Sequence, residues 1–115
     1  MTQTAECLFC RIVSGEIPAD IVQATDDTVA FRDVAPQAPT HVLVVPRQHH
    51  RDIAALAFAD PVLAGRLLAD AAQVASDLGA DEFRLVLNTG ATAGQSVFHV
   101  HAHVLAGRDF GWPPG

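Results

Sequence analysis

The chain has 115 residues, of which half are hydrophobic and 17% are charged, so it can bury a core and is unlike a disordered segment. Its formal net charge is −6 and its seven basic residues, all arginines, are dispersed, which argues against nucleic acid as a partner. The lack of lysine excludes P-loop and Schiff-base chemistry, and the lack of a long apolar run excludes a membrane span.

The first half of the chain predicts a short helix and three strands. Apolar side chains at helical spacing predict the helix over residues 7–14. Residues 21–25 and 28–32 predict two strands on either side of an Asp-Asp turn, and residues 41–45 predict a third strand before a proline.

The second half predicts one long helix and two more strands. The apolar stripe over residues 61–78 follows Asp-Pro and stops at a glycine, as an amphipathic helix does. Residues 83–87 and 98–105 predict strands, separated by a loop at 88–96. Together these elements indicate an α+β domain with a mostly antiparallel five-stranded sheet, one long helix and one short helix.

No repeat or linker divides the chain, so we expect a single domain over residues 1–115, with a short flexible N-terminus at 1–5 and a C-terminal tail at 107–115. The first residues lack the basic and apolar regions of a signal peptide, which makes the cytoplasm the expected location. In that reducing compartment Cys7 and Cys10 suit a metal site, a redox pair or a buried core better than a structural disulfide.

The most informative motif is His99-x-His101-x-His103. Because alternate residues of a strand share a face, the three imidazoles are expected to project together while the residues between them enter the core. The loop before them carries Gly90 and Gly94, which let backbone amides turn inward. Loop and imidazoles together predict a phosphate cradle; a tri-histidine metal centre, a plain turn and ordinary structural histidines are the alternatives.

These motifs resemble the histidine-triad (HIT) family, and most closely its Hint branch of purine nucleoside phosphoramidases. The resemblance covers the triad with its two following apolar residues, the phosphate loop at 94–99, the nucleoside-binding region at 31–46 and the C-terminus at 107–115. It implies a HIT-like fold whose sheet extends across a homodimer, with Trp112 shaping leaving-group specificity at the interface. A frayed tail is the alternative for Trp112.

The resemblance also implies catalytic roles for His101, His103, His41 and Ser96. His101 would attack the α-phosphorus of an adenosine 5′-phosphoramidate, and water would hydrolyse the resulting nucleotidyl-histidine. A neutral imidazole is a competent nucleophile near pH 7, and no cofactor is required. His103 would contact phosphate oxygens, Ser96 the phosphate or the departing amine, and His41 would support the triad.

A purine nucleotide of the AMP or GMP type is the implied partner, and the resemblance assigns its contacts. Asp33 would accept hydrogen bonds from both ribose hydroxyls. The phosphate would lie against Asn88, Gly94, Gln95, Ser96, Val97, His101 and His103. The purine would enter an apolar slot of Phe9, Ile12, Ile17, Phe31 and Val34, for which ordinary core is the alternative. Asn88 favours the Hint branch, because the dinucleoside-polyphosphate-hydrolysing branch is expected to carry Gln there.

A second site is implied by Cys7, Cys10, His49 and His99, which resemble the structural zinc ligands of some bacterial members and of galactose-1-phosphate uridylyltransferases. Two cysteines and two histidines suit tetrahedral zinc. Metal-free reduced cysteines are the alternative, and His50, otherwise without a role, competes with His49. For function, the alternatives are an Ap4A-type dinucleoside polyphosphate hydrolase and a non-catalytic nucleotide-binding interaction protein.

Overall fold

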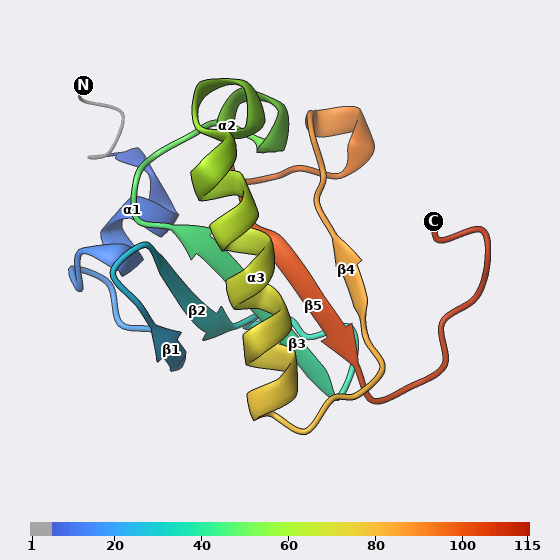
Figure 1. Ribbon diagram of the computed structural model, residues 1–115. Helices are drawn as coiled ribbons and strands as arrows, with labels where there is room; N and C mark the ends of the chain where they lie inside the picture. Colours follow the sequence, from blue (N-terminus) through green and yellow to red (C-terminus); the bar gives the residue numbers. More distant parts are fainter. Residues whose placement is uncertain (1–5) are drawn as a thin grey trace.

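The computed structural model describes residues 6–115, so the flexible N-terminus expected at 1–5 lies outside the described residues. Five strands form one sheet in the order β1-β2-β3-β5-β4, and every neighbouring pair is antiparallel. The strands are β1 (Ile21–Ala24), β2 (Thr28–Arg32), β3 (Thr40–Pro46), β4 (Arg84–Val86) and β5 (Ala102–Ala106) (Figure 1). The expected α+β class with a five-stranded antiparallel sheet is confirmed.

Within the described residues 6–115, three α-helices accompany the sheet: α1 (Leu8–Val13), α2 (Ile53–Ala59) and α3 (Pro61–Asp77). The long helix α3 lies across one face of the sheet (Figure 1). Asp60 begins α3 by accepting a hydrogen bond from the backbone N–H of Leu63 at 3.0 Å. Helix α2 was not expected from the sequence, because its seven residues are all apolar and show no helical stripe.

Strand β3 separates two apolar cores, because its successive side chains point to opposite faces. Val42 and Val44 are fully buried beneath α3, together with Leu67 of that helix. Leu43 and Val45 face the other side, where they pack with residues of α1 and β2. Within residues 6–115, no helix combines the length and the apolar character needed to cross a membrane.

Strand β5 is shorter than expected, which corrects the prediction of a strand from residue 98. Its pairing with β3 begins at Ala102, opposite Val44. Beyond this pair, at the end of β3, the carbonyl of Pro46 accepts a hydrogen bond from the His99 ring at 2.9 Å. The His99 side chain therefore takes the place of a backbone N–H of β5 as the donor to this carbonyl, and His99 and His101 precede the strand.

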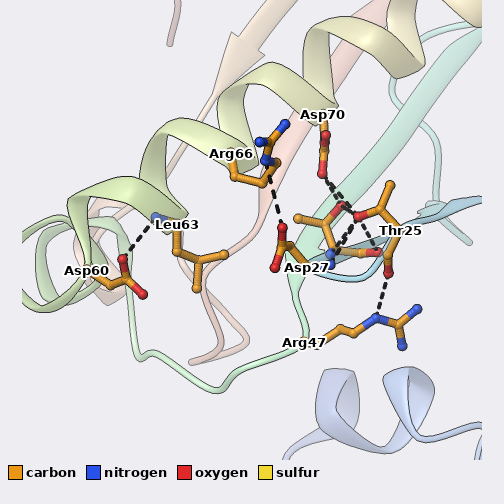
Figure 2. A network of polar contacts seen from close by, with 8 residues as sticks. Thr25, Asp27, Arg47, Asp60, Leu63, Arg66 and Asp70 are labelled. Atoms are coloured by element: carbon orange, nitrogen blue, oxygen red, sulfur yellow. Dashed lines mark hydrogen bonds and ion pairs between the residues drawn. The ribbon is translucent and has the colours of Figure 1, made fainter.

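A polar network ties α3 to the turn between β1 and β2 (Figure 2). The buried carboxylate of Asp70 accepts hydrogen bonds from the hydroxyls of Thr28 at 2.7 Å and Thr25 at 3.2 Å. At the surface, Arg66 forms an ion pair with Asp27 at 3.7 Å. Because Thr25 and Thr28 flank the turn, this network sets the position of the helix along the sheet.

Replacing Asp70 by alanine is expected to lower the free energy of unfolding by about 1–3 kcal/mol, because the buried Thr28 hydroxyl loses its acceptor. Urea denaturation followed by circular dichroism measures the change. The matched control is Asp81→Ala, at an exposed position, which is expected to change stability by less than about 0.5 kcal/mol. Equal stabilities for the two variants would contradict the role given to the network.

Candidate functional site

The face of the sheet opposite α3 carries a cleft of about 710 Å³. The structure brings ten of the expected nucleotide-site residues to its lining: Phe9, Ile12, Ile17, Phe31, Asp33, Val34, Ser96, Val97, His101 and His103. His41, Asn88, Gly94 and Gln95 do not line it and lie behind the lining residues or in the adjacent loop. Leu43 lines the cleft as well, and alternation with His41 along β3 could have identified it.

The apolar end of the cleft is also part of the second core. Phe9 and Phe31 are buried, and their rings meet edge to face with centroids 5.4 Å apart. Ile12 and Ile17 are half-buried, whereas Val34 is fully exposed at the rim. The two phenylalanines therefore belong both to the core and to the cleft wall, so a purine slot and an ordinary core, the two interpretations of these positions, are compatible.

The ring of His101 has a defined tautomer. Its Nδ1 lies 2.8 Å from the carbonyl oxygen of His99, and only a protonated nitrogen can bond there. The lone pair is therefore on Nε2. Burial lowers the pKa of His101 from its ordinary value, against opposing effects of the His99 carbonyl and Asp33. His101 thus presents a neutral, unprotonated Nε2 near neutral pH.

His103 has the opposite tautomer, set through His41. The backbone N–H of Gln37 donates to Nδ1 of His41 at 3.0 Å, so Nε2 of His41 carries the proton. That nitrogen lies 2.9 Å from Nδ1 of His103 and 3.4 Å from a carboxylate oxygen of Asp33. His103 accepts at Nδ1 and keeps its own proton on Nε2 as a donor.

The pKa of His103 is lowered to about 4, chiefly by burial. Repulsion between a protonated His103 and the neighbouring imidazoles of His101 and His41 lowers it further, whereas the carboxylate of Asp33 opposes the shift. The ring is therefore neutral at physiological pH. The rings of His101 and His103 have centroids 4.9 Å apart, so that the nucleophilic nitrogen of His101 and the N–H donor of His103 are neighbours.

The loop before the histidines is held by Gln95. Its buried side chain accepts a hydrogen bond from the backbone N–H of Gly90 at 2.9 Å and donates to the carbonyls of Arg51 at 2.8 Å and Val97 at 3.1 Å. These bonds occupy the amide that the sequence analysis assigned to the phosphate. Gln95 shapes the loop instead, and the exposed Ser96 beside it borders the cleft.

Glycine is required at position 94 of this loop. Gly94 has a φ of +105°, and a Cβ there would lie 3.4 Å from the side-chain nitrogen of Asn88. A side chain would strain the backbone at this positive φ, and its Cβ would touch Asn88. Asn88 is half-buried, and the loop closes over it through a short 3-10 helix (Ala91–Ala93).

The four expected metal ligands come together beside α1, where their donor atoms all lie within 4.8 Å of one another. Nδ1 of His99 lies 3.4 Å from the sulfur of Cys7, 3.3 Å from that of Cys10 and 3.2 Å from Nδ1 of His49. His50 is not in this group, and its buried Nε2 has no hydrogen-bond partner among residues 6–115. The structure therefore favours His49 over His50.

The chemistry of these four residues fits a metal ion. His99 donates its Nε2 proton to the carbonyl of Pro46, which leaves the lone pair of Nδ1 directed at the two sulfurs. Burial lowers the pKa of His99 to about 4, so the ring is neutral as a ligand must be. Burial and the neighbouring Cys7 raise the pKa of Cys10 to about 12, so without a metal it stays a thiol.

The C-terminal tail lies away from the cleft of its own chain. Arg84 donates to the carbonyl of Gly111 at 2.8 Å, and the guanidinium of Arg108 lies 4.1 Å from the ring centre of Phe110. Trp112 is 85% exposed and does not line the cleft. Any part it plays in substrate selection must therefore involve a second molecule.

Comparison with known proteins places the chain among relatives of one family. A family model described as HIT domain matches residues 14–110. An uncharacterised HIT-like protein of Synechocystis is 50% identical over 111 residues, which cover 96% of this chain and 97% of the relative.

Two solved structures extend the likeness to three dimensions. A HIT family hydrolase from Legionella pneumophila Philadelphia 1 is 44% identical with a TM-score of 0.90, covering 95% of this chain and 99% of that one. A histidine triad nucleotide-binding protein from Candida albicans is 29% identical with a TM-score of 0.81, covering 93% and 82%.

The tautomers of the two cleft histidines can be measured by long-range ¹H–¹⁵N NMR, with signals assigned by comparison with His103→Gln. We expect protonated Nδ1 in His101 and protonated Nε2 in His103 at pH 7. Because the pKa of His103 is lowered to about 4, its signals should hardly shift between pH 7 and about 5.5, where an ordinary histidine is mostly protonated. Protonation of His103 over that range would contradict the hydrogen-bond chain.

Proposed function

The chain belongs to the HIT domain family, and from that premise we propose that it is a purine nucleoside phosphoramidase, a hydrolase of the P–N bond in adenosine 5′-phosphoramidates. The observation that carries the proposal is the pair of complementary tautomers at the base of the cleft. His101 offers an unprotonated Nε2, and His103, with its ring centroid 4.9 Å away, offers an N–H donor. Transfer of a phosphoryl group needs both: a nitrogen lone pair that attacks phosphorus and an N–H that holds a phosphate oxygen.

The cleft suggests how a nucleotide would lie. We assign the purine to the apolar end between Phe9 and Phe31, and the ribose hydroxyls to the carboxylate of Asp33. One oxygen of Asp33 already accepts the backbone N–H of Ala35 at 2.9 Å, which holds the carboxylate in place. The phosphate would then lie at His101 and His103 beside the glycine-bearing loop, with Asn88 and Gly94 shaping that loop.

The proposed reaction has two displacements at phosphorus. Nε2 of His101 attacks the α-phosphorus, the P–N bond to the amine breaks, and a nucleotidyl-histidine forms. His103 donates its Nε2 proton in a hydrogen bond to a phosphate oxygen. As the P–N bond breaks, the nitrogen takes up a proton from solvent through the Ser96 hydroxyl and leaves as the amine. Water then attacks the same phosphorus and releases a proton to solvent, the bond to His101 breaks and returns the lone pair to its Nε2, and the nucleoside monophosphate leaves.

Substituting His101 by alanine is expected to lower hydrolysis of a fluorogenic adenosine phosphoramidate by roughly 10⁴-fold or more, because the nucleophile is lost. Rapid-quench experiments on the unsubstituted protein should trap an acid-labile nucleotidyl-enzyme, which His101→Ala should not form. His50→Asn, a histidine substitution outside the cleft, is the matched control and should stay within a few-fold of the original rate. Unchanged turnover by His101→Ala would overturn the assignment of the nucleophile.

The same assay separates the competing functions. Faster hydrolysis of Ap4A than of the phosphoramidate would indicate a dinucleoside polyphosphate hydrolase. Nucleotide binding without turnover of either compound would indicate a nucleotide-binding interaction protein. The HIT family hydrolase from Legionella pneumophila supports a hydrolase, and the nucleotide-binding protein from Candida albicans supports a nucleotide as ligand.

We further propose that Cys7, Cys10, His49 and His99 bind a structural zinc ion. Two thiolates and two neutral imidazoles match the charge and ligand types that tetrahedral zinc prefers. These residues would join α1 to the segment that follows β3 and to the segment that precedes β5, and zinc would supply a structural crosslink there rather than a catalytic group. The two cysteines precede the segment matched by the family model, whereas His49 and His99 lie within it.

Elemental analysis of protein purified from zinc-replete medium is expected to find about one equivalent of zinc per chain. Cys10→Ser and His49→Asn should each lose the metal and lower the melting temperature, because bound metal stabilises only the folded state. His50→Asn should keep the metal, since His50 lies outside the ligand group. Less than about a tenth of an equivalent in the unsubstituted protein would contradict the proposal.

We also propose that the chain forms a homodimer and is located in the cytoplasm. Strand β4 has a neighbour on one side only, and an edge of this kind allows the sheet to continue into a second copy of the chain. In such a homodimer the exposed Trp112 could reach the partner's cleft and contact the leaving group. Both cysteines are free thiols beside histidines, a state suited to the cytoplasm.

A further inference from the structure

A second groove, of about 600 Å³, lies next to the nucleotide cleft. The two share Leu8, Ser96 and Val97, so this part of the chain forms the rim between them. The remaining residues of the groove are Glu6, Cys7, His49, Arg51 and Phe98. None of the roles assigned above uses Arg51 or Phe98.

Arg51 is held over this groove with its hydrogen-bonding capacity largely unused. Its guanidinium carbon lies 4.4 Å from the ring centre of Phe98, a cation–π distance. Its backbone carbonyl accepts the side-chain N–H of Gln95, which ties Arg51 to the loop that carries Ser96. Its acidic neighbour Asp52 is 3.9 Å away, at the limit of an ion pair, and the Arg51 side chain is 65% exposed.

Four of the six other arginines use their N–H groups in hydrogen bonds within the fold, while Arg32 and Arg66 form ion pairs at 3.6 and 3.7 Å. Arg47, Arg84 and Arg108 donate to backbone carbonyls at 2.8–2.9 Å, and Arg11 bonds Glu16 at 2.6 Å. In a chain with a net charge of −6, a guanidinium stacked on a ring beside the cleft is a specific attraction for a negative group. Its planar fork can bond a carboxylate or a phosphate through two parallel hydrogen bonds, and a carboxylate is the group that a substituent on the departing amine would carry.

The proposed role of Ser96 brings the leaving group to the border of this groove. In phosphoryl transfer the attacking and departing atoms lie roughly in line with phosphorus. An amine displaced by His101 therefore leaves on the side away from that ring, and Ser96 borders both the cleft and the groove. A substituent on the amine would pass over Ser96 toward Arg51.

We infer that this groove is a leaving-group subsite for amines that bear a carboxylate, with Arg51 as the residue that selects them. The inference rests on the proposed phosphoramidase function. Glu6 also lines the groove, so net attraction at a distance is weak, and selection requires direct contact between the carboxylate and the guanidinium. The preference should therefore weaken, but not vanish, as salt concentration rises.

The test compares matched substrates that differ only in charge. These are the adenosine 5′-phosphoramidates of glycine, β-alanine and 4-aminobutanoic acid, each paired with the corresponding carboxamide. For at least one chain length, the unsubstituted protein should show a kcat/KM roughly tenfold higher for the acid than for its amide, the effect of about 1.4 kcal/mol of charge-assisted hydrogen bonding. Arg51→Gln should bring that ratio to about one, and Arg51→Lys should restore part of it. Arg66→Gln, remote from the groove, should keep the full ratio.

Equal kcat/KM values for acid and amide at every chain length, in protein that hydrolyses both, would overturn the subsite and leave the phosphoramidase proposal intact. If neither compound is hydrolysed, the phosphoramidase proposal fails, and titration calorimetry with the same compounds decides the subsite. Tighter binding of the acid that Arg51→Gln abolishes would support it. Equal affinities would overturn it.

Discussion

The carbonyl of His99 accepts the Nδ1 proton of His101 at 2.8 Å, while the ring of His99 donates its own Nε2 proton to the carbonyl of Pro46 at 2.9 Å. These two bonds fix the end of β3, direct Nδ1 of His99 toward Cys7 and Cys10, and place the free lone pair of His101 on Nε2. Because His99 is completely buried, neither bond competes with water. The candidate metal group and the candidate nucleophile therefore share one residue, and a change in either reaches the other through a single peptide group.

Burial also keeps the two cleft histidines neutral. The pKa values of His101 and His103 are both lowered, the latter to about 4, and burial is the first cause in each case. A cleft lined with lysines would attract phosphate more strongly. An ordinary lysine side chain is protonated at neutral pH, however, so it has no lone pair with which to attack phosphorus. Here phosphate recognition is assigned to imidazole and hydroxyl donors, while Arg51 lies outside, over the adjacent groove. Under the proposed function, this division would let a chain of net charge −6 and without lysine bind a phosphorylated substrate.

Strand β3 makes the site possible because both of its faces are buried. Its even-numbered valines pack under α3, and its odd-numbered side chains point to the opposite face, where Leu43 lines the cleft and His41 bonds His103 behind it. A slip of one residue in its pairing with β5 would exchange the two sets and separate His41 from His103. The continuous apolar character of the strand therefore stabilises the register on which the hydrogen bond between the two imidazoles depends.

Local rules were enough to predict most elements and the main site residues. Asp60-Pro61 and Gly79 delimit α3, and the alternation around His101 and His103 survives even though β5 begins later than expected. Other features depend on partners distant in the sequence. The Pro46 carbonyl, 53 positions from His99, ends the strand pairing and turns the His99 ring toward the cysteines. Likewise, the Gln95 amide bonds the loop and the Arg51 carbonyl instead of facing the cleft. The sequence by itself determined which residue types gather in this protein; the tertiary structure decided which atom each directs at the ligand, because those directions are set by hydrogen bonds that close only when distant segments meet.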